Sequence, residues 1–211
     1  MRMPKRQQCK ALVEAIYIQF DASHDFEHVL RVEQNALAIA ASYEDVDIET
    51  LQLAVYLHDV SDKKYAADTA ALEQILKTLQ LPVMQEQHVR HIIEAISFRG
   101  GNEIETQTLE AQIARDADRL DALGAIGIAR AFAFGGAKGR KLYDDAEAAR
   151  TEMTEDAYYG KPTATVTHFY EKLLTLQQHM CTEKGRALAK ERHAFMKQFL
   201  TQLAKEREGL L

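Results

Sequence analysis

The stretch Leu51-Gln-Leu-Ala-Val-Tyr-Leu57 is apolar at almost every position, and His58-Asp59 follows it directly. An element that is apolar on nearly all sides lies in the centre of a protein. Because a buried carboxylate is costly without a partner, Asp59 needs a cation, hydrogen-bond donors or a metal ion. Two interpretations stand side by side. Either His58 and Asp59 each give one ligand atom to an ion, or His58 is a satisfied core histidine and Asp59 caps the next helix.

Apolar residues recur at helical spacing on both sides of this stretch, and no strand-like alternation occurs. The chain has only 10 Gly and 3 Pro, which favours long helices over short strands joined by tight turns. We therefore predict an all-α protein. The expected helices cover residues 9–20, 26–42, 47–57, 64–79, 83–98, 108–134, 165–180 and 184–205, and we interpret Gly135-Gly136 as a helix stop.

A length of 211 residues suits one domain. We place the helical core at about 20–135, a long charged loop at 137–163 and C-terminal helices at about 164–206. A loop of that length is usually functional or disordered. The expected architecture is a single helical bundle that spans residues 1–211.

Charge and composition exclude several classes. A net charge of −6 argues against a binder of nucleic-acid polymers, although a local basic pocket for a small anion stays open. The two cysteines form no metal-binding motif and are interpreted as free thiols of a reducing compartment. Neither a secretory signal nor a bilayer-spanning segment is expected. We expect a cytoplasmic protein with no membrane partner.

The predicted helix at 26–42 carries a polar face. His24, His28, Arg31 and Asn35 follow one another at helical offsets, opposite the apolar face. Taken alone, such a face is a solvated surface more often than a site.

Two carboxylates stand in an unusual position on the predicted helix at 108–134. Asp118 and Asp121 are three residues apart and fall within a stripe of small apolar residues formed by Ala114, Ala125 and Ile128. The alternative is a salt-bridged surface turn that uses Arg115 and Arg119, which explains Asp116 easily and Asp118 poorly.

Taken together, three predicted helices supply two imidazoles and two carboxylates. This mixed nitrogen and oxygen set suits a divalent first-row ion that keeps positions open for water and substrate. We expect one divalent ion, with Mn²⁺ or Mg²⁺ favoured and Fe²⁺, Co²⁺ or Ni²⁺ as alternatives. The residues that would hold it are His28, His58, Asp59 and Asp118.

The order H…HD…D on these helices resembles that of the HD-domain metal-dependent phosphohydrolases. The flanking sequences are similar to those of the small bacterial stand-alone subgroup, which includes nucleoside-triphosphate pyrophosphohydrolases. The similar segments are His24-Asp-Phe-Glu-His-Val-Leu-Arg-Val32, Leu57-His-Asp-Val-Ser-Asp-Lys-Lys64, Ile93-Glu-Ala-Ile-Ser-Phe98, Asp116-Ala-Asp-Arg-Leu-Asp-Ala-Leu-Gly-Ala-Ile-Gly127, Thr163-Ala-Thr-Val-Thr-His-Phe-Tyr-Glu-Lys172 and Glu191-Arg-His-Ala-Phe-Met196.

This resemblance implies an HD-type helical bundle in which the four residues are metal ligands. It also implies hydrolysis of a (deoxy)nucleoside triphosphate to a monophosphate and pyrophosphate through attack by a metal-activated water. Three alternatives use the same site: a nucleoside monophosphatase, a cyclic-nucleotide phosphodiesterase and a non-catalytic nucleotide-binding domain. In each case the partner is a small phosphorylated molecule, and the sequence leaves the oligomeric state open.

Supporting roles are assigned more broadly. His24, Asp62 and Lys63 are candidate catalytic residues, and Lys64 is the alternative to Lys63 because the helical phase after Asp59 is uncertain. The candidate substrate-binding residues are Arg31, Arg119, His168 and Lys172. Arg31, Lys63 and Arg119 each have a surface or salt-bridge interpretation beside the functional one, and the alternative for His168 is a packing residue. Asp121 is a candidate for orienting a metal ligand.

Overall fold

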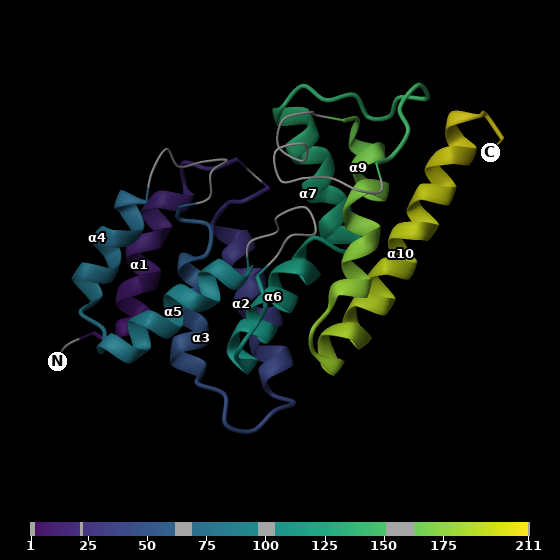
Figure 1. The fold of residues 1–211 in the computed structure, drawn as a ribbon. Coiled ribbons are helices and arrows are strands. Elements are labelled where there is room, and N and C mark those ends of the chain that lie inside the picture. Colours follow the sequence, from purple (N-terminus) through teal and green to yellow (C-terminus); the bar gives the residue numbers. More distant parts are fainter. Residues whose placement is uncertain (1–2, 22, 62–68, 97–103, 151–162, 211) are drawn as a thin grey trace.

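The structure is a computed structural model, and it describes residues 3–21, 23–61, 69–96, 104–150 and 163–210. Every regular element within those ranges is a helix, which confirms the predicted all-α class (Figure 1). The elements are α1 (Lys5–Tyr17), α2 (Phe26–Ala40), α3 (Ile48–Leu57), α4 (Ala70–Leu79), α5 (Val83–Ile96), α6 (Leu109–Asp121), α7 (Gly124–Ala137), α9 (Thr165–Glu171), the 3₁₀ helix η1 (Leu173–His179) and α10 (Glu183–Arg207).

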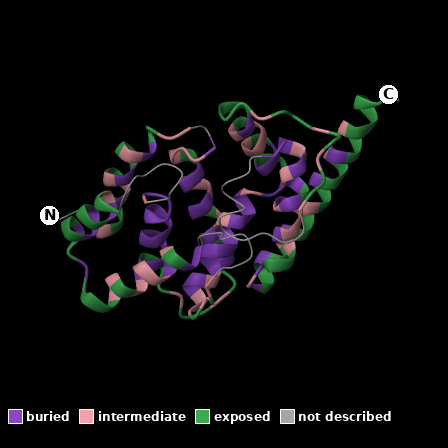
Figure 2. Ribbon diagram, turned by 45° about the horizontal axis from the view of Figure 1, so that its top comes forward, coloured by how far each residue is buried: buried purple, intermediate pink, exposed green. Residues whose placement is uncertain are grey.

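Helix α6 occupies the centre of the molecule. It packs against α2, α3 and α5 on one side and against α7 and α10 on the other (Figure 1). Buried residues line the faces where the helices meet, whereas the C-terminal helix α10 is exposed along much of its length (Figure 2). This arrangement places the polar residues of α6 between two groups of helices.

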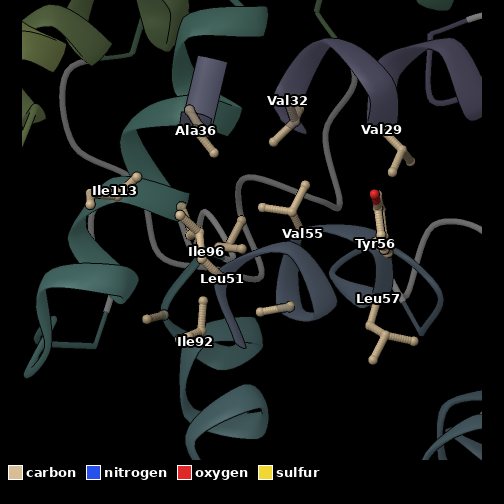
Figure 3. Packing of buried hydrophobic residues seen from close by; sticks show 14 of the residues in the cluster. Val29, Val32, Ala36, Leu51, Val55, Tyr56, Leu57, Ile92, Ile96 and Ile113 are labelled. Carbon is tan, nitrogen blue, oxygen red and sulfur yellow. The ribbon is translucent and has the colours of Figure 1, made fainter. Parts of the chain in front are cut away.

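Helix α3 is the most apolar part of the core, as its sequence predicts. All residues from Thr50 to Leu57 are buried. Leu51 and Val55 of this helix lie among apolar side chains of α2, α5 and α6, including Val32, Ile92 and Ile113 (Figure 3). His58 and Asp59 therefore follow an element that is fixed on every side.

Side-chain caps begin several of these helices. Asp25 accepts a hydrogen bond from the His28 amide, Asp47 from the Thr50 amide, and Thr108 from the Ala111 amide. Such caps satisfy backbone amides that the first turn of a helix leaves without partners. The cap at Asp25 also fixes the position of His28 in the first turn of α2.

The prediction of one long helix over residues 108–134 is wrong in one respect, because the chain bends between Asp121 and Gly124. Helices α6 and α7 meet at an angle of 69°. Leu123 is extended, and Gly124 adopts a positive φ of 70° that side chains rarely tolerate. A Cβ at Gly124 would also lie 3.1 Å from Cγ of Arg192 on α10, so close packing at the bend favours glycine.

Three other expected boundaries differ. Gly135 and Gly136 lie inside α7, which ends at Ala137, and are not its stop. The segment expected as one helix over 165–180 is α9 followed by η1, because Lys172 leaves the helical conformation. Helix α4 is described from Ala70, and residues 64–68 of the helix expected at 64–79 lie outside the described residues.

The charged residues of α6 are buried, so the alternative interpretation of this segment as a salt-bridged surface turn is wrong. Asp116 is fully buried and accepts hydrogen bonds from the Cys181 and Thr182 amides and from the Thr182 hydroxyl. Arg115 donates to the Ala95 carbonyl at 2.6 Å. These contacts tie the centre of the bundle to α5 and to the start of α10.

The described part of the long loop is fixed to α9. The Thr165 amide donates to the Lys141 carbonyl and the Val166 amide to the Leu142 carbonyl, at 3.0 and 2.9 Å. The rest of the expected loop, from 151 to 162, lies outside the described residues.

Among the described helices, none by itself is long and apolar enough to cross a bilayer. Helices α6 and α7 meet that criterion only as a bent pair, by length and composition alone.

Candidate metal centre and adjoining pocket

The structure brings the four predicted metal ligands together. Nε2 of His28 lies 3.3 Å from Nε2 of His58, and 3.5 Å from both Oδ2 of Asp59 and Oδ1 of Asp118. Nε2 of His58 lies 3.3 Å from the same oxygen of Asp59 and 3.8 Å from that of Asp118. Three of these residues each offer one ligand atom, and the three atoms lie within 4.8 Å of one another; the residues are His28, His58 and Asp118.

Each side chain reaches this cluster for a local reason. His28 projects from the first turn of α2, which the Asp25 cap fixes. His58 and Asp59 follow the buried helix α3, and the Tyr17 hydroxyl accepts a hydrogen bond from the Asp59 amide. Asp118 comes from α6, the helix that packs against both α2 and α3.

Hydrogen bonds behind the two imidazoles determine which nitrogen faces the cluster. Nδ1 of His58 lies 2.7 Å from the Val55 carbonyl, and Nδ1 of His28 lies 2.7 Å from Oδ2 of Asp121. Both partners accept hydrogen bonds from Nδ1, so the Nε2 atom of each ring faces the other side chains of the cluster. The two Nε2 atoms are 3.3 Å apart, and their lone pairs repel each other unless a proton or a metal ion lies between them.

The electrostatics of the cluster lead to the same conclusion. Burial on its own lowers the pKa of His58, but the carboxylates of Asp59 and Asp118 outweigh it and raise that pKa to about 9. Burial raises the pKa of Asp59, and the neighbouring imidazoles of His58 and His28 overcome it, so that the pKa falls well below its usual range. The cluster therefore attracts positive charge strongly.

This donor set fits a divalent ion. Ligand atoms about 2.1 Å from an octahedral ion lie about 3 Å apart, close to the separations between these nitrogens and oxygens. The cluster is also partly open, since the Asp118 side chain is 29 % exposed. The site therefore has room for ligands other than the protein.

Asp121 forms a second layer behind His28. Besides that imidazole, its carboxylate accepts hydrogen bonds from Arg31 Nε at 2.8 Å and from Arg130 Nη1 at 3.0 Å. Burial raises the pKa of Asp121, and the hydrogen bonds from His28 and Arg31 outweigh it and lower that pKa far below its usual range. Asp121 is therefore ionised and is placed to orient His28.

A pocket of about 450 Å³ adjoins this centre. His24 lines the pocket, and its ring centroid lies 5.7 Å from that of His28 and 6.2 Å from that of Phe134. His168 and Lys172, two of the predicted substrate-binding residues, line it as well. The pocket therefore connects His24 with residues of α7 and α9.

The structure does not bring the other two predicted substrate-binding cations to the pocket lining. Arg31 pairs with Asp121, and its side chain is 32 % exposed. Arg119 is buried and donates from Nη1 to the His179 carbonyl, so it ties α6 to the segment before α10. The predicted catalytic residues Asp62 and Lys63, together with the alternative Lys64, lie outside the described residues.

Sequence reasoning missed several residues of the pocket. Four more cations and one aromatic ring line it, namely Arg130, Lys138, Arg140, Arg150 and Phe134. Three of the cations come from the charged segment after Gly136, where no helical period indicates which way a side chain points. The available signal was the run Lys138, Arg140 and Lys141 at the start of that segment, directly after an apolar helix.

The fold and the cluster define an all-α protein with a buried histidine–aspartate centre of the kind that holds a divalent ion. The HD domain family model matches residues 25–123, which include all four candidate ligands. YpgQ of Bacillus subtilis, a protein described as uncharacterised, is 37 % identical over 99 % of this chain and 96 % of its own length.

Solved structures show the same relationship. A crystal structure from Lactobacillus plantarum has a TM-score of 0.90 at 33 % identity and covers 99 % of both chains. YpgQ in complex with ADP has a TM-score of 0.74 at 33 % identity over 96 % of this chain and 94 % of its own. An HD-superfamily hydrolase from Bacillus thuringiensis has a TM-score of 0.72 at 34 % identity over 97 % of both chains. The chain therefore belongs to the HD-domain phosphohydrolase superfamily.

Proposed function

We propose that the protein is a metal-dependent phosphohydrolase of nucleotides, which converts a (deoxy)nucleoside triphosphate to a monophosphate and pyrophosphate. The observation that carries this proposal is the convergence of His28, His58, Asp59 and Asp118 beside a pocket rich in cations. The first feature suits a divalent ion and the second suits phosphate groups.

His28, His58, Asp59 and Asp118 would hold the ion, with Mn²⁺ or Mg²⁺ favoured. A divalent ion bound there supplies Lewis acidity, which polarises a phosphoryl oxygen and favours deprotonation of water near neutral pH. The protein contributes the fixed geometry. Asp121 holds the His28 ring in the required tautomer, and the Val55 carbonyl does the same for His58.

His24 is the described residue best placed to move a proton. Its ring lies beside that of His28, and Ser23 Oγ is 2.8 Å from its Nδ1. The pocket begins at the same ring, so His24 would meet a phosphoester that extends from the metal centre. In this proposal His24 donates a proton to the leaving oxygen, His168 and Lys172 contact the phosphates, and Asp62 or Lys63 remains a candidate for positioning water.

The similar protein YpgQ has been crystallised with ADP, and this supports a nucleotide as the substrate class. A nucleoside triphosphate fits the excess of cations in the pocket better than a monophosphate does. We therefore favour the pyrophosphohydrolase over the monophosphatase and the phosphodiesterase, and we propose an intracellular nucleotide as the partner.

The test is a panel of nucleoside triphosphates, monophosphates and cyclic nucleotides with product analysis, run in ¹⁸O-labelled water with Mn²⁺ or Mg²⁺. We expect a monophosphate and pyrophosphate in equal amounts, with the label in the monophosphate. His58→Ala, purified in the same way, serves as the inactive control. Orthophosphate from monophosphates alone, opening of cyclic nucleotides alone, or calorimetric nucleotide binding without turnover would each contradict the proposal and indicate one of the alternatives.

A further inference from the structure

The pocket beside the metal centre is strongly basic within an acidic chain. Five Lys or Arg residues and a single carboxylate, Glu171, are among the described residues that line it, whereas the whole chain has a net charge of −6. A local excess of positive charge in a concave site raises the local concentration of anions. The question is which part of a substrate it receives.

Two of the five cations are already neutralised by the protein. Arg130 pairs with Asp121 at 3.0 Å and also donates to the Ser23 carbonyl. Arg150 pairs with Glu171, with Nε 2.6 Å from Oε1. These two arginines support the walls of the pocket through contacts that a ligand would have to break.

Lys138 and Arg140 are different, because neither forms an ion pair with a described residue. Both lie over one aromatic ring, with Lys138 Nζ 5.6 Å and Arg140 Cζ 5.1 Å from the centroid of Phe134. Nε of Arg140 is buried and has no hydrogen-bond partner among the described residues. Like charges gathered on one ring repel each other, and a bound anion removes that cost.

We infer that Lys138 and Arg140, on the platform of Phe134, bind the diphosphate end of the substrate, which leaves as pyrophosphate. This inference rests on the proposed function, since it names the part of the substrate that this pocket takes. The His24 ring contacts the rings of both His28 and Phe134, so a phosphate chain that starts at the metal centre and passes His24 reaches the two cations over Phe134.

A nucleobase fits the same place less well. Stacking on Phe134 would compete with the two cations that already lie over the ring, whereas phosphate oxygens give those cations hydrogen-bond acceptors. The pocket therefore selects for the length of the phosphate chain, and the nucleoside binds elsewhere.

The experiment compares the two expected products, pyrophosphate and the nucleoside monophosphate, as ligands of the metal-loaded protein. Inorganic tripolyphosphate, pyrophosphate and a nucleoside monophosphate are titrated by calorimetry at fixed ionic strength into the wild type and into Lys138→Met/Arg140→Met. Methionine keeps the length and the contact with the ring and removes the charge. Lys77→Met, at an exposed position in the last turn of α4, is the matched control.

We expect the double variant to bind tripolyphosphate and pyrophosphate about tenfold more weakly or worse, with the monophosphate affinity changed by less than about twofold and the control unchanged. Equal weakening of both ligand classes, or no weakening, would overturn the inference.

Turnover separates this inference from the proposed function. If the wild type hydrolyses triphosphates and the double variant keeps their KM, the pyrophosphohydrolase stands and the diphosphate site is wrong. If the double variant loses tripolyphosphate binding but the wild type hydrolyses no triphosphate, the site stands and the proposed reaction is wrong. Thermal unfolding of each variant confirms that the fold is intact.

Discussion

At the scale of single residues, the candidate metal centre depends on how each side chain is held. The sequence predicts that His58 and Asp59 need a partner, because they form a polar pair directly after a fully apolar helix. It singles out Asp118 by its place in an apolar stripe. The Val55 carbonyl behind His58 was beyond prediction, because a backbone acceptor leaves no mark in the pattern of residue types.

The substitution Asp59→Ala should remove a metal ligand without unfolding the protein. We expect turnover to fall by about a hundredfold or more and the unfolding free energy by less than about 1.5 kcal/mol. The stability change is small because the Asp118 carboxylate remains beside both imidazoles, 3.5 Å from Nε2 of His28 and 3.8 Å from Nε2 of His58. Steady-state kinetics and urea unfolding measure the two effects, with the exposed Asp145→Ala as the control. A fully active variant that still binds metal would refute the ligand assignment.

Asp121→Asn tests the layer behind the ligands. Asparagine keeps the shape of the side chain but removes the negative charge that faces Arg31 and Arg130. It also weakens the hydrogen bond that orients the His28 ring. Metal affinity should fall about 10- to 100-fold, and stability by ~3 kcal/mol. Metal titration and thermal unfolding provide the measurements. Asp145→Asn, at a side chain that is 75 % exposed, should change neither. If the two variants behave alike, Asp121 has no orienting role.

At the scale of elements, sequence periodicity predicted which segments are helical better than where they bend. The break between α6 and α7 depends on Gly124 and on Arg192, which donates to the Leu120 carbonyl from a helix far along the chain. A contact at that sequence distance is invisible to local patterns. The same limit hid the pocket cations Lys138 and Arg140, whose directions are set by the packing of their segment beside α7 and α9.

Adjacent glycines of α7 provide a matched pair. A Cβ at Gly135 would overlap the Thr165 hydroxyl of α9, whereas a Cβ at Gly136 meets no atom within 4 Å. We expect Gly135→Ala to lower the unfolding free energy by about 1–3 kcal/mol and Gly136→Ala to raise it by up to ~1 kcal/mol, because alanine favours a helix over glycine. Thermal unfolding of the two variants and the wild type measures both changes. A stabilised Gly135→Ala variant would contradict the close packing of α7 on α9.

The ion pair between Glu171 of α9 and Arg150 makes part of the stability depend on pH. Burial raises the pKa of Glu171, but hydrogen bonds from Arg150 and Thr163 outweigh it and lower that pKa. Because the folded pKa lies below the unfolded value of about 4.3, this contribution is complete above that value and is lost as the pH falls through the folded pKa. Glu171→Gln should therefore show a weaker loss of Tm in acid than the wild type. An identical acid dependence of Tm in both proteins would refute this contribution.

At the scale of the whole molecule, the charge of the pocket is opposite in sign to the net charge of the chain. The chain has a net charge of −6, yet the described pocket gathers five Lys or Arg residues. The composition is compatible with a local basic site but does not indicate where that site lies. The pocket forms only when α7, α9 and the segment after α7 pack together.

This distribution predicts a dependence on ionic strength. Raising salt from about 0.05 to 0.5 M should increase the KM for a triphosphate several-fold through screening, with little change in Tm. The inhibition constant of the nucleoside monophosphate product, measured against the same triphosphate, should change less. A KM for the triphosphate that is insensitive to salt would contradict electrostatic binding in the pocket.

We propose that two histidines and two aspartates of the bundle hold one divalent ion. Elemental analysis of protein that has been saturated with Mn²⁺ and desalted tests this most directly, with the wild type and His58→Ala measured side by side. We expect about one ion per chain in the wild type and almost none in the variant. A wild-type protein that retains no ion, or a variant that retains as much as the wild type, would contradict it.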